Sequence, residues 1–459
     1  MQRERLGSRL GFILLSAGCA IGIGNVWKFP YLVGANGGGA FLLFYVLFLI
    51  VIGVPVMTIE FALGRASQKS PVRMYHALEP KGSKWHVFSY FSIIGNYLLM
   101  MFYTTVAGWM LNYFVYSAQG KFDGITNDTA KEVTSGIFDA LKQNPIESGI
   151  FTAIVIIACF AVCSIGLQKG LERVTKWMMI ALLIIMLVLA VSSIISDTSG
   201  EGLRFYLIPN MDNIRKVGLF NIIVAAMNQA FFTLSIGIGN MAIFGSYIGK
   251  ERTLMGEAVN VAVLDTFVAI CSGLIIFPAC FSMGIMPDSG PSLIFITLPG
   301  IFSSLPLGRL WGSLFFIFLT FAAASTVLTV FENIICCTCE MFGWSRKRSC
   351  IYNCIAMLVL SAPCVLGFNL LSGFTPFGAG SNVMDLEDFI VSNILLPLGA
   401  LIFVIFATHR YGWGWKKFVA EANEGKGLKM PMWLRPYVAY VIPAIIFFIF
   451  VIGIVSKFS

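Results

Sequence analysis

The chain has 459 residues, of which 58% are hydrophobic and only 12% are charged, and its mean hydropathy is +0.84. A soluble protein carries about 25% charged residues, so the composition excludes a single soluble core and indicates a polytopic membrane protein. The formal net charge of +8 arises from basic residues dispersed beside apolar runs, which does not indicate a nucleic-acid partner.

Eleven apolar segments are long enough to cross a bilayer, which takes about 20 helical residues. The sequence predicts spans at 9–34, 39–66, 88–117, 149–167, 175–196, 219–248, 256–285, 307–339, 350–371, 388–408 and 436–457. The first span carries no small-residue cleavage motif, so we do not expect a cleaved signal peptide. One transmembrane domain covering 1–459 is expected.

Lysine and arginine residues set the orientation of these spans. With the N-terminus in the cytoplasm, the inner segments carry most of the 31 basic residues, as the positive-inside rule requires. The odd number of spans then places the C-terminus outside. The segment 118–148 is expected to be an outer loop, and the polar segment 409–435 an inner one.

Two matching stretches interrupt the first and sixth spans. Ile21-Gly22-Ile23-Gly24-Asn25 and Ile236-Gly237-Ile238-Gly239-Asn240 each place two glycines inside an apolar run. Glycine weakens a helix by about 1 kcal/mol relative to alanine, and broken backbone in a bilayer occurs where it lines a cavity. Paired breaks in two halves of a chain indicate the binding site of a transporter.

The breaks also divide the chain into two sets of five spans. The first set covers about 9–196 and the second about 219–408, with an additional span at about 436–457. Because five is odd, the second set enters the membrane from the opposite side. The sequence therefore predicts an all-α membrane protein with a 5+5 inverted repeat, broken spans 1 and 6, and an eleventh span.

Three acidic residues lie within predicted spans, where charge is costly and often functional. For Glu60 and Glu332 we favour structural hydrogen bonds, and Glu60 is placed to satisfy backbone freed at a break. For Asp265 we favour a functional role, because its negative charge could neutralise a bound cation. The freed carbonyls, the Asn25 amide and the hydroxyls of span 8 offer the oxygen ligands that a hard cation prefers.

Cysteines and histidines give no sign of an enzyme. Most of the eleven cysteines lie in apolar runs, where they behave as small hydrophobes, and no histidine lies near Cys336, Cys337 and Cys339. The three histidines, His76, His86 and His409, lie in predicted loops. No span carries a histidine, which argues against a membrane enzyme.

A set of motifs follows in order along nearly the whole chain: Arg9-Leu10-Gly11, Gly22-Ile23-Gly24-Asn25, Phe29-Pro30-Tyr31, Asn36 to Phe41, Gly53-Val54-Pro55, Gly64-Arg65, Phe231 to Ser235 and Ser325-Thr326. In these motifs the chain resembles bacterial members of the neurotransmitter:sodium symporter family. The resemblance implies the LeuT-type fold and sodium-coupled symport by alternating access, with two Na⁺ ions and an amino acid as substrate.

The resemblance also implies two sodium sites. The first would use the substrate carboxylate and residues of spans 1, 6 and 7, namely Ala20, Asn25, Thr233 and Asp265. Asp265 departs from the family's usual asparagine and would supply the negative charge that other members take from chloride, so transport would be chloride-independent. The second site would use Gly18, Ile21, Ala322, Ser325 and Thr326.

A substrate pocket follows from the same resemblance. Its expected residues are Cys19, Ala20, Gly22, Gly24, Leu99, Tyr103, Phe232, Thr233, Ser235, Ile238, Val327 and Val330. None is charged, and a charge buried there without a partner would be unfavourable, so a neutral, hydrophobic or aromatic amino acid is favoured. The expected gates are Lys28 with Asp388 on the outside and Arg3 with Glu340 on the inside.

Two alternatives stay open. One is a symporter of another small amine or compatible solute, which the retained Gly24 disfavours. The other is an amino-acid sensor that does not transport, which the lack of a soluble signalling domain disfavours. Short termini and an outer loop without a cysteine pair favour a multi-pass protein of a bacterial plasma membrane.

Overall fold

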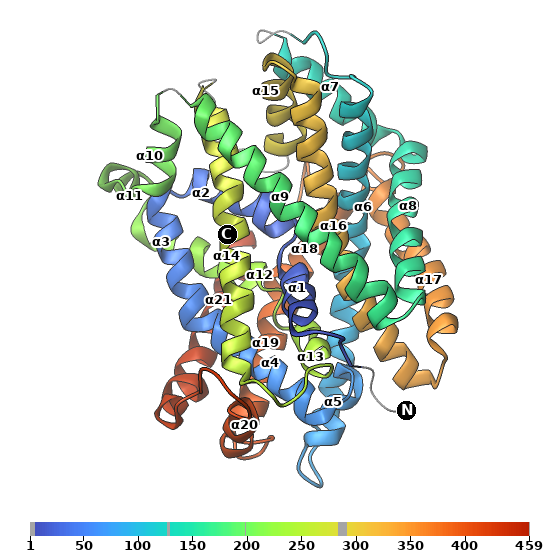
Figure 1. Ribbon diagram of the computed structural model, residues 1–459, viewed down its shortest axis with the longest axis vertical. Coiled ribbons are helices and arrows are strands. Elements are labelled where there is room, and N and C mark those ends of the chain that lie inside the picture. Colours follow the sequence, from blue (N-terminus) through green and yellow to red (C-terminus); the bar gives the residue numbers. More distant parts are fainter. Residues whose placement is uncertain (1–4, 126–128, 198, 283–291, 459) are drawn as a thin grey trace.

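The computed structural model describes residues 5–125, 129–197, 199–282 and 292–458, and the regular elements in this part of the chain are all helices (Figure 1). Among the described residues, nine helices are long and apolar enough to span a membrane. A tenth span is the pair Arg9–Ala20 (α1) and Gly24–Ala35 (η1, Gly24–Lys28; α2, Phe29–Ala35), which is bent by 56°.

The nine continuous spans match the predicted ones closely. They are Gly39–Ser67 (α3, Gly39–Phe48; η2, Leu49–Gly53; α4, Val54–Ser67), Trp85–Ala118 (η3, Trp85–Phe88; α6, Ser89–Ala118), Pro145–Ser164 (α8), Leu167–Ile195 (η4, Leu167–Glu172; α9, Arg173–Ser196), Leu254–Ser282 (α14), Gly308–Phe342 (α16), Arg346–Leu366 (α17), Val383–Thr408 (α18, Val383–Phe389; η6, Ile390–Leu395; α19, Leu396–Thr408) and Met432–Val455 (η7, Met432–Leu434; η8, Tyr437–Val441; α21, Ile442–Phe458).

The predicted sixth span is divided into two short helices, Leu219–Thr233 (α12) and Asn240–Gly245 (α13). Neither piece reaches the length of a span, so the predicted total of eleven is met only if the two are counted together. The predicted break is the physical reason, because six residues between the helices leave the helical conformation.

Short helices cover the two ends of the bundle. At one end are Ala130–Gln143 (α7), Glu201–Leu207 (α10), Met211–Val217 (α11), Leu293–Thr297 (η5) and Leu298–Ser304 (α15); at the other are Pro71–Leu78 (α5) and Trp415–Ala422 (α20). The N-terminus lies at the end that carries α5 and α20 (Figure 1). The segment 118–148, expected as an outer loop, thus contains α7, and the segment 409–435, expected as an inner loop, contains α20. His76 and His86, expected in loops, lie in α5 and η3.

Helix α1, which leads into the first break, has a defined beginning and end. Ser8 caps α1, with its hydroxyl accepting from the Gly11 amide at 2.9 Å. The helix ends where Ile21 adopts an extended conformation, with ψ of 101°. A Cβ at Gly22 would lie 2.3 Å from the Tyr103 hydroxyl, so only glycine allows this approach.

The second break needs positive φ angles, at Ser235 (50°), Gly237 (106°) and Gly239 (77°). At Gly237 a Cβ would lie 2.1 Å from the carbonyl oxygen of Leu396, so the broken segment packs directly on the backbone of α19. The glycines therefore serve both the turn and the close approach.

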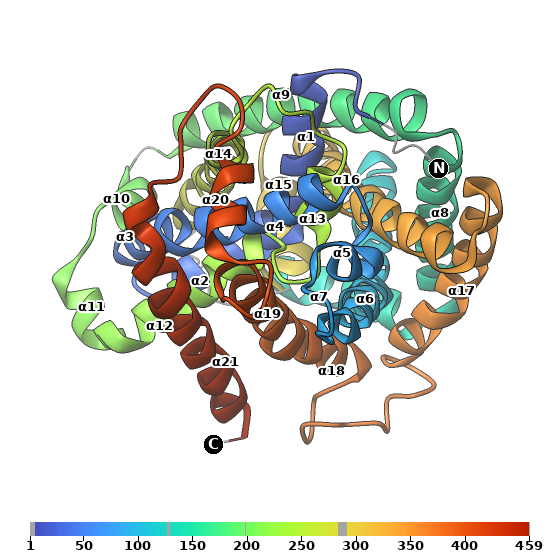
Figure 2. The same ribbon diagram turned by 90° about the horizontal axis from the view of Figure 1, so that it is seen from below.

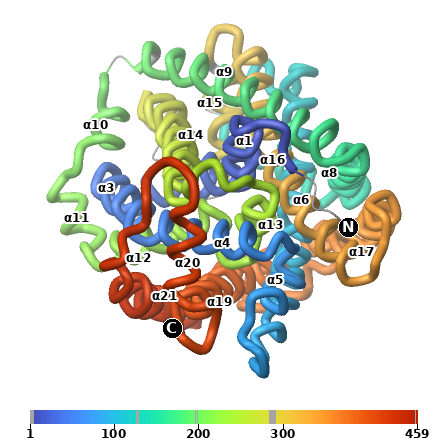
Figure 3. The backbone as a smooth tube through the Cα atoms, turned by 60° about the horizontal axis from the view of Figure 1, so that its bottom comes forward, coloured from blue at the N-terminus to red at the C-terminus, as the bar shows by residue number. Residues whose placement is uncertain are grey.

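Both breaks lie inside the bundle. Figures 2 and 3 show α13 and α16 toward the middle and α8 and α17 at the rim. In the most apolar stretch of α16, 72% of the residues are buried by other parts of the molecule, against 39% in α8 and in α17. The long helices α6 and α16 thus form a scaffold beside the breaks, as expected where irregular backbone is shielded from lipid.

Candidate functional site

The two breaks lie side by side. The Ser235 hydroxyl donates to the Cys19 carbonyl at 3.2 Å, and a Cβ at Gly24 would lie 3.0 Å from the Phe232 ring. Side chains from other helices bind the freed backbone. The side-chain amide of Gln229 donates to the backbone carbonyl of Gly24 at 3.0 Å. The hydroxyl of Ser272 donates to the backbone carbonyl of Asn25 at 2.7 Å. The unwound segment is therefore held by polar contacts as well as by packing.

One group of oxygens joins the end of α1 to α16. The Thr326 hydroxyl lies 3.2 Å from the Gly18 carbonyl oxygen and 3.3 Å from that of Ile21. The Ser325 hydroxyl lies 3.5 Å from the Ile21 oxygen and 2.9 Å from that of Ala322. All five residues expected at the second sodium site thus contribute to one buried oxygen cluster, with the uncharged hard ligands that suit a monovalent cation.

A second group surrounds Asp265 on α14. Its carboxylate accepts from the Asn25 amide at 2.8 Å, from the Thr233 hydroxyl at 3.2 Å and from the Tyr45 hydroxyl at 3.4 Å. Asp265 is fully buried, and these three donors are all uncharged. A buried carboxylate among neutral partners is a strong electrostatic attraction for a cation. The sequence did not indicate Tyr45, although a buried tyrosine hydroxyl usually finds a partner.

A small cavity of about 20 Å³ lies between the two breaks. Nine of the twelve expected substrate residues line it: Cys19, Ala20, Gly22, Gly24, Leu99, Tyr103, Phe232, Thr233 and Ser235. Thr326 and Leu396 complete the wall, and no lining side chain is charged. The Tyr103 hydroxyl accepts from the amide of Ile23 at 3.0 Å, at the point where the first break exposes its backbone.

Three expected residues do not line this cavity. Ile238 turns its carbonyl to Asn96 at 2.9 Å. Val327 and Val330 are fully buried on α16. Relative to Thr326, which lines the cavity, Val327 is turned by about 100° around the helix axis. Val330 lies about 6 Å from Thr326 along that axis. Leu396 was missed, because α19 is apolar on every face as far as Thr408 and no periodicity distinguishes Leu396 from its neighbours.

A larger cavity of about 250 Å³ lies next to the small one, and Tyr103 and Phe232 line both. The expected gate residues Lys28 and Asp388 also line it. The structure does not join them in an ion pair. The Lys28 ammonium lies 3.8 Å from the centroid of the Phe232 ring, and Asp388 accepts from the hydroxyl of Ser392 at 2.7 Å. The ammonium therefore covers the aromatic partition between the two cavities.

At the other end of the bundle, the expected inner pair cannot be compared as a whole, because Arg3 lies outside the described residues. Glu340 accepts from the amide of Ser70 at 3.0 Å and from its hydroxyl at 2.7 Å. A different ion pair joins Arg9 to Glu257 at 2.9 Å, beside a cavity of about 380 Å³.

The residues directly before α1 are also tied to η4. The Glu172 carboxylate accepts from the Gly7 amide at 2.8 Å and from the Ser8 hydroxyl at 3.1 Å. A Cβ at Gly11 would lie 1.9 Å from that carboxylate. The start of the first span therefore rests directly on the start of the fifth.

The other two intramembrane acids have the structural contacts that the sequence favoured. Glu60 accepts from the Gly237 amide at 2.5 Å and so stabilises the second break. Glu332 pairs with Arg346, whose Nη1 lies 3.0 Å away, and accepts from the Tyr247 hydroxyl at 2.7 Å. The ion pair was not predicted, since Arg346 lies outside the predicted spans.

Comparisons with known proteins identify the same kind of protein over nearly the whole length of the chain. The family described as "Sodium:neurotransmitter symporter family" matches residues 3–144 and 143–459. An uncharacterized sodium-dependent transporter, YhdH of Bacillus subtilis, is 32% identical over 98% of both chains. Another of Haemophilus influenzae is 31% identical over 98% of both.

Among solved structures, the crystal structure of MhsT in complex with L-phenylalanine is similar, with 36% identity and a TM-score of 0.86. The match covers 98% of this chain and 100% of that one. The two broken spans, the buried oxygen clusters beside them and these matches lead to one conclusion: the chain belongs to the sodium:neurotransmitter symporter family, whose members are sodium-dependent membrane transporters and not enzymes, and it has the LeuT-type fold.

Proposed function

We propose that the protein is a symporter that couples two Na⁺ ions to the uptake of a neutral, hydrophobic or aromatic amino acid by alternating access, without chloride. The observation that carries the proposal is the position of Asp265, whose buried carboxylate lies among neutral donors next to the cavity between the two breaks. A fixed negative charge at this place favours a cation and makes an additional anion unnecessary.

The first ion would lie among Ala20, Asn25, Thr233, Asp265 and the substrate carboxylate. In the structure the Asn25 amide N–H donates to Asp265. A cation needs the amide oxygen on that side instead, so sodium binding would turn the Asn25 side chain about its terminal torsion. Because the substrate would be a ligand of this ion, sodium and substrate would increase each other's affinity reciprocally.

The second ion would lie among the oxygens of Gly18, Ile21, Ala322, Ser325 and Thr326. The two hydroxyls contact the carbonyl oxygens at 2.9 to 3.5 Å. A cation would occupy the centre of this group and bind the oxygens in place of the hydroxyl protons. Since the group joins α1 to α16, loss of this ion would loosen α1 from the scaffold.

The substrate would occupy the small cavity after it widens. Phe232 separates this cavity from the outer one and is itself covered by the ammonium of Lys28, so outward movement of its ring would open the path. The substrate carboxylate would lie near the Gly22 and Gly24 backbone and the Tyr103 hydroxyl. The uncharged wall supports a neutral side chain, and the similar protein MhsT was crystallised with L-phenylalanine.

Gating would involve charged residues at both ends. Lys28 and Asp388 line the outer cavity, so a rearrangement of their side chains would allow the outer pair to form over a bound substrate. On the inside, Arg3 would pair with Glu340. The distribution of basic residues supports a cytoplasmic N-terminus and an external C-terminus. The outer loop without a cysteine pair supports a bacterial plasma membrane.

The test is uptake of a radiolabelled amino-acid panel into proteoliposomes. An inward Na⁺ gradient is compared with an inward K⁺ gradient, each with chloride and with gluconate as the anion. Concentrative uptake of a few neutral amino acids, only with Na⁺ and equally with both anions, is the expected result.

Other outcomes separate the alternatives. Sodium-dependent binding without accumulation would contradict transport and favour a sensor. Uptake of amines or compatible solutes alone would contradict the substrate assignment, and a requirement for chloride would contradict the role of Asp265.

A further inference from the structure

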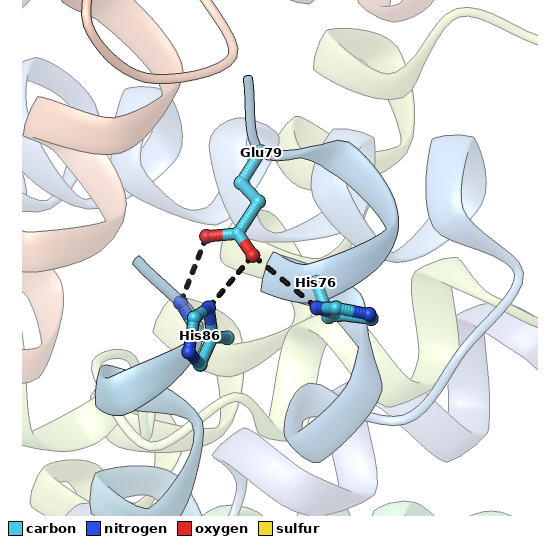
Figure 4. A group of neighbouring side chains, drawn as sticks. All are labelled: His76, Glu79 and His86. Carbon is cyan, nitrogen blue, oxygen red and sulfur yellow. Dashed lines mark hydrogen bonds and ion pairs between the residues drawn. The ribbon is translucent and has the colours of Figure 1, made fainter. Parts of the chain in front are cut away.

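Two histidines and a glutamate gather at the end of the molecule that carries the N-terminus (Figure 4). His76 lies in the last turn of α5, Glu79 directly follows this helix, and His86 lies in η3. The Nδ1 atoms of His76 and His86 lie 3.3 Å and 2.7 Å from the same oxygen, Oε1 of Glu79. All three possible ligand atoms lie within 4.8 Å of one another.

The carboxylate at the centre is held in place from its other side. Oε2 of Glu79 accepts from the backbone amide of His86 at 3.1 Å and from the hydroxyl of Ser83 at 3.1 Å. Only 8% of the Glu79 side chain is exposed, against 69% for His76 and 45% for His86. The cluster is thus a fixed, largely buried carboxylate with two imidazoles that reach it from the solvent side.

The surrounding backbone is anchored as well. The indole N–H of Trp85 donates to the Tyr411 carbonyl at 2.7 Å, and its ring contacts that of Phe406. At the other end of α5, Ser70 contacts Glu340 of α16. The turn that brings the three side chains together is therefore fixed to two spans, α16 and α19, beyond its own neighbours.

The arrangement has the dimensions of a metal site. Zinc binds histidine nitrogen and carboxylate oxygen at about 2.0–2.2 Å, so neighbouring ligands of a tetrahedral ion lie roughly 3.3–3.5 Å apart. The His76–Glu79 distance of 3.3 Å already fits, and the His86–Glu79 distance of 2.7 Å needs a small rotation of an exposed ring. Two imidazoles with one carboxylate form a ligand set that zinc commonly takes, with water in the fourth position.

We propose that His76, Glu79 and His86 form a binding site for a divalent transition-metal ion, with Zn²⁺ as the ion that fits best. The two nitrogen ligands disfavour Mg²⁺ and Ca²⁺, which prefer all-oxygen sites. The site lies at one end of the bundle and is therefore separate from the proposed sodium sites. A bound ion would cross-link α5 to η3, at the start of the third span.

The experiment measures Zn²⁺ binding by equilibrium dialysis of the purified full-length protein in detergent, followed by metal analysis. The variants are His76→Ala, His86→Ala and Glu79→Gln, and His409→Ala is the matched control because it removes the third histidine of the chain. The wild type is expected to bind one more Zn²⁺ than the His76→Ala/His86→Ala double variant. Each single change should weaken this binding by more than about 100-fold, since even outer-shell partners contribute about 10–100-fold.

The eleven cysteines could also take zinc, so a second readout identifies the ligands. Co²⁺ bound to nitrogen and oxygen gives visible d–d bands without the near-ultraviolet charge-transfer band of a cobalt–thiolate bond. The proposal expects d–d bands that the double variant lacks and His409→Ala retains. Equal zinc binding by wild type and double variant, or a cobalt signal with thiolate character only, would overturn the proposal and leave a hydrogen-bonded cluster without a metal.

Discussion

Gly237 and Gly399 meet backbone to backbone, and a Cβ at Gly399 would lie 1.8 Å from the Gly237 carbonyl oxygen. The approach is equally close from the other side: a Cβ at Gly237 would lie 2.1 Å from the carbonyl oxygen of Leu396, which lies on α19 together with Gly399. The backbone of α19 is therefore in direct contact with the unwound segment between α12 and α13, with no side chain between them.

Replacement of Gly237 by alanine should abolish uptake and lower the midpoint of thermal unfolding, because the methyl group would meet the Leu396 carbonyl. Gly124→Ala is the matched control. It also has a positive φ, of 75°, but a Cβ there would meet nothing within 4 Å. Both changes carry the backbone strain of about 1–2 kcal/mol. If Gly124→Ala were equally harmful, strain alone and not the contact with α19 would explain the loss.

Asp265→Asn should reduce sodium-dependent substrate binding by at least about 10-fold, since the change keeps the shape and removes the charge that would face the ion. The loss should be partly reversed by chloride, which would restore a negative charge. Scintillation proximity binding across Na⁺ concentrations, with chloride or gluconate, measures both effects. Tyr45→Phe removes only the weaker 3.4 Å contact with Asp265 and should have a much smaller effect. Unchanged sodium dependence in Asp265→Asn would refute the proposed role.

Thr326→Val should remove one ligand of the second sodium ion and leave the first sodium site unchanged. Valine matches the shape of threonine but has no oxygen, so the sodium dependence of binding should become less cooperative and shift to higher concentration. Thr320→Val on the same helix is the control, because the Thr320 hydroxyl donates to the Phe316 carbonyl one turn before it and, within the described part of the chain, has no other hydrogen-bond partner. Equal sodium titrations for wild type and Thr326→Val would place the second ion elsewhere.

Arg65→Lys should destabilise the protein although the charge is kept. The fully buried guanidinium donates from Nε to the Glu421 carboxylate at 2.6 Å and from Nη1 to the Arg252 carbonyl at 2.8 Å. One ammonium cannot reproduce this fork, so at least one charged hydrogen bond of about 1.5–3 kcal/mol is lost. Thermal unfolding in detergent measures the change, and the exposed Arg73→Lys should leave the midpoint unaltered.

The backbone breaks were predictable from sequence, since paired glycines inside two apolar spans have a direct local cause. Glu60 was also placed well, because an isolated acid in a span needs nearby backbone donors. Asp265, Asn25 and the hydroxyls of span 8 were indicated by the residues themselves, whereas their division into two complete clusters came from resemblance to a family. The structure brings these residues together.

Long-range pairing was harder to predict. Leu396 on α19 lines the small cavity and Val330 on α16 does not, yet both are aliphatic residues within apolar spans, and nothing in the sequence distinguishes them. The position of Lys28 over Phe232 depends on side-chain rotation, which one sequence does not encode. The partner of Glu332 lies 14 positions away, across a turn, so helix periodicity could not find Arg346.

The hydrogen bonds between Glu172 and the residues directly before α1 have a consequence for the order of movements in a transport cycle. Because Glu172 holds both Gly7 and Ser8, α1 can swing away only after these bonds separate or if η4 moves with it. η4 is a π-helical segment that begins at Leu167, directly after Gly166, whose φ is 120°. The start of the fifth span and the start of the first thus form one mechanical unit, and the rate of inward opening would depend on both.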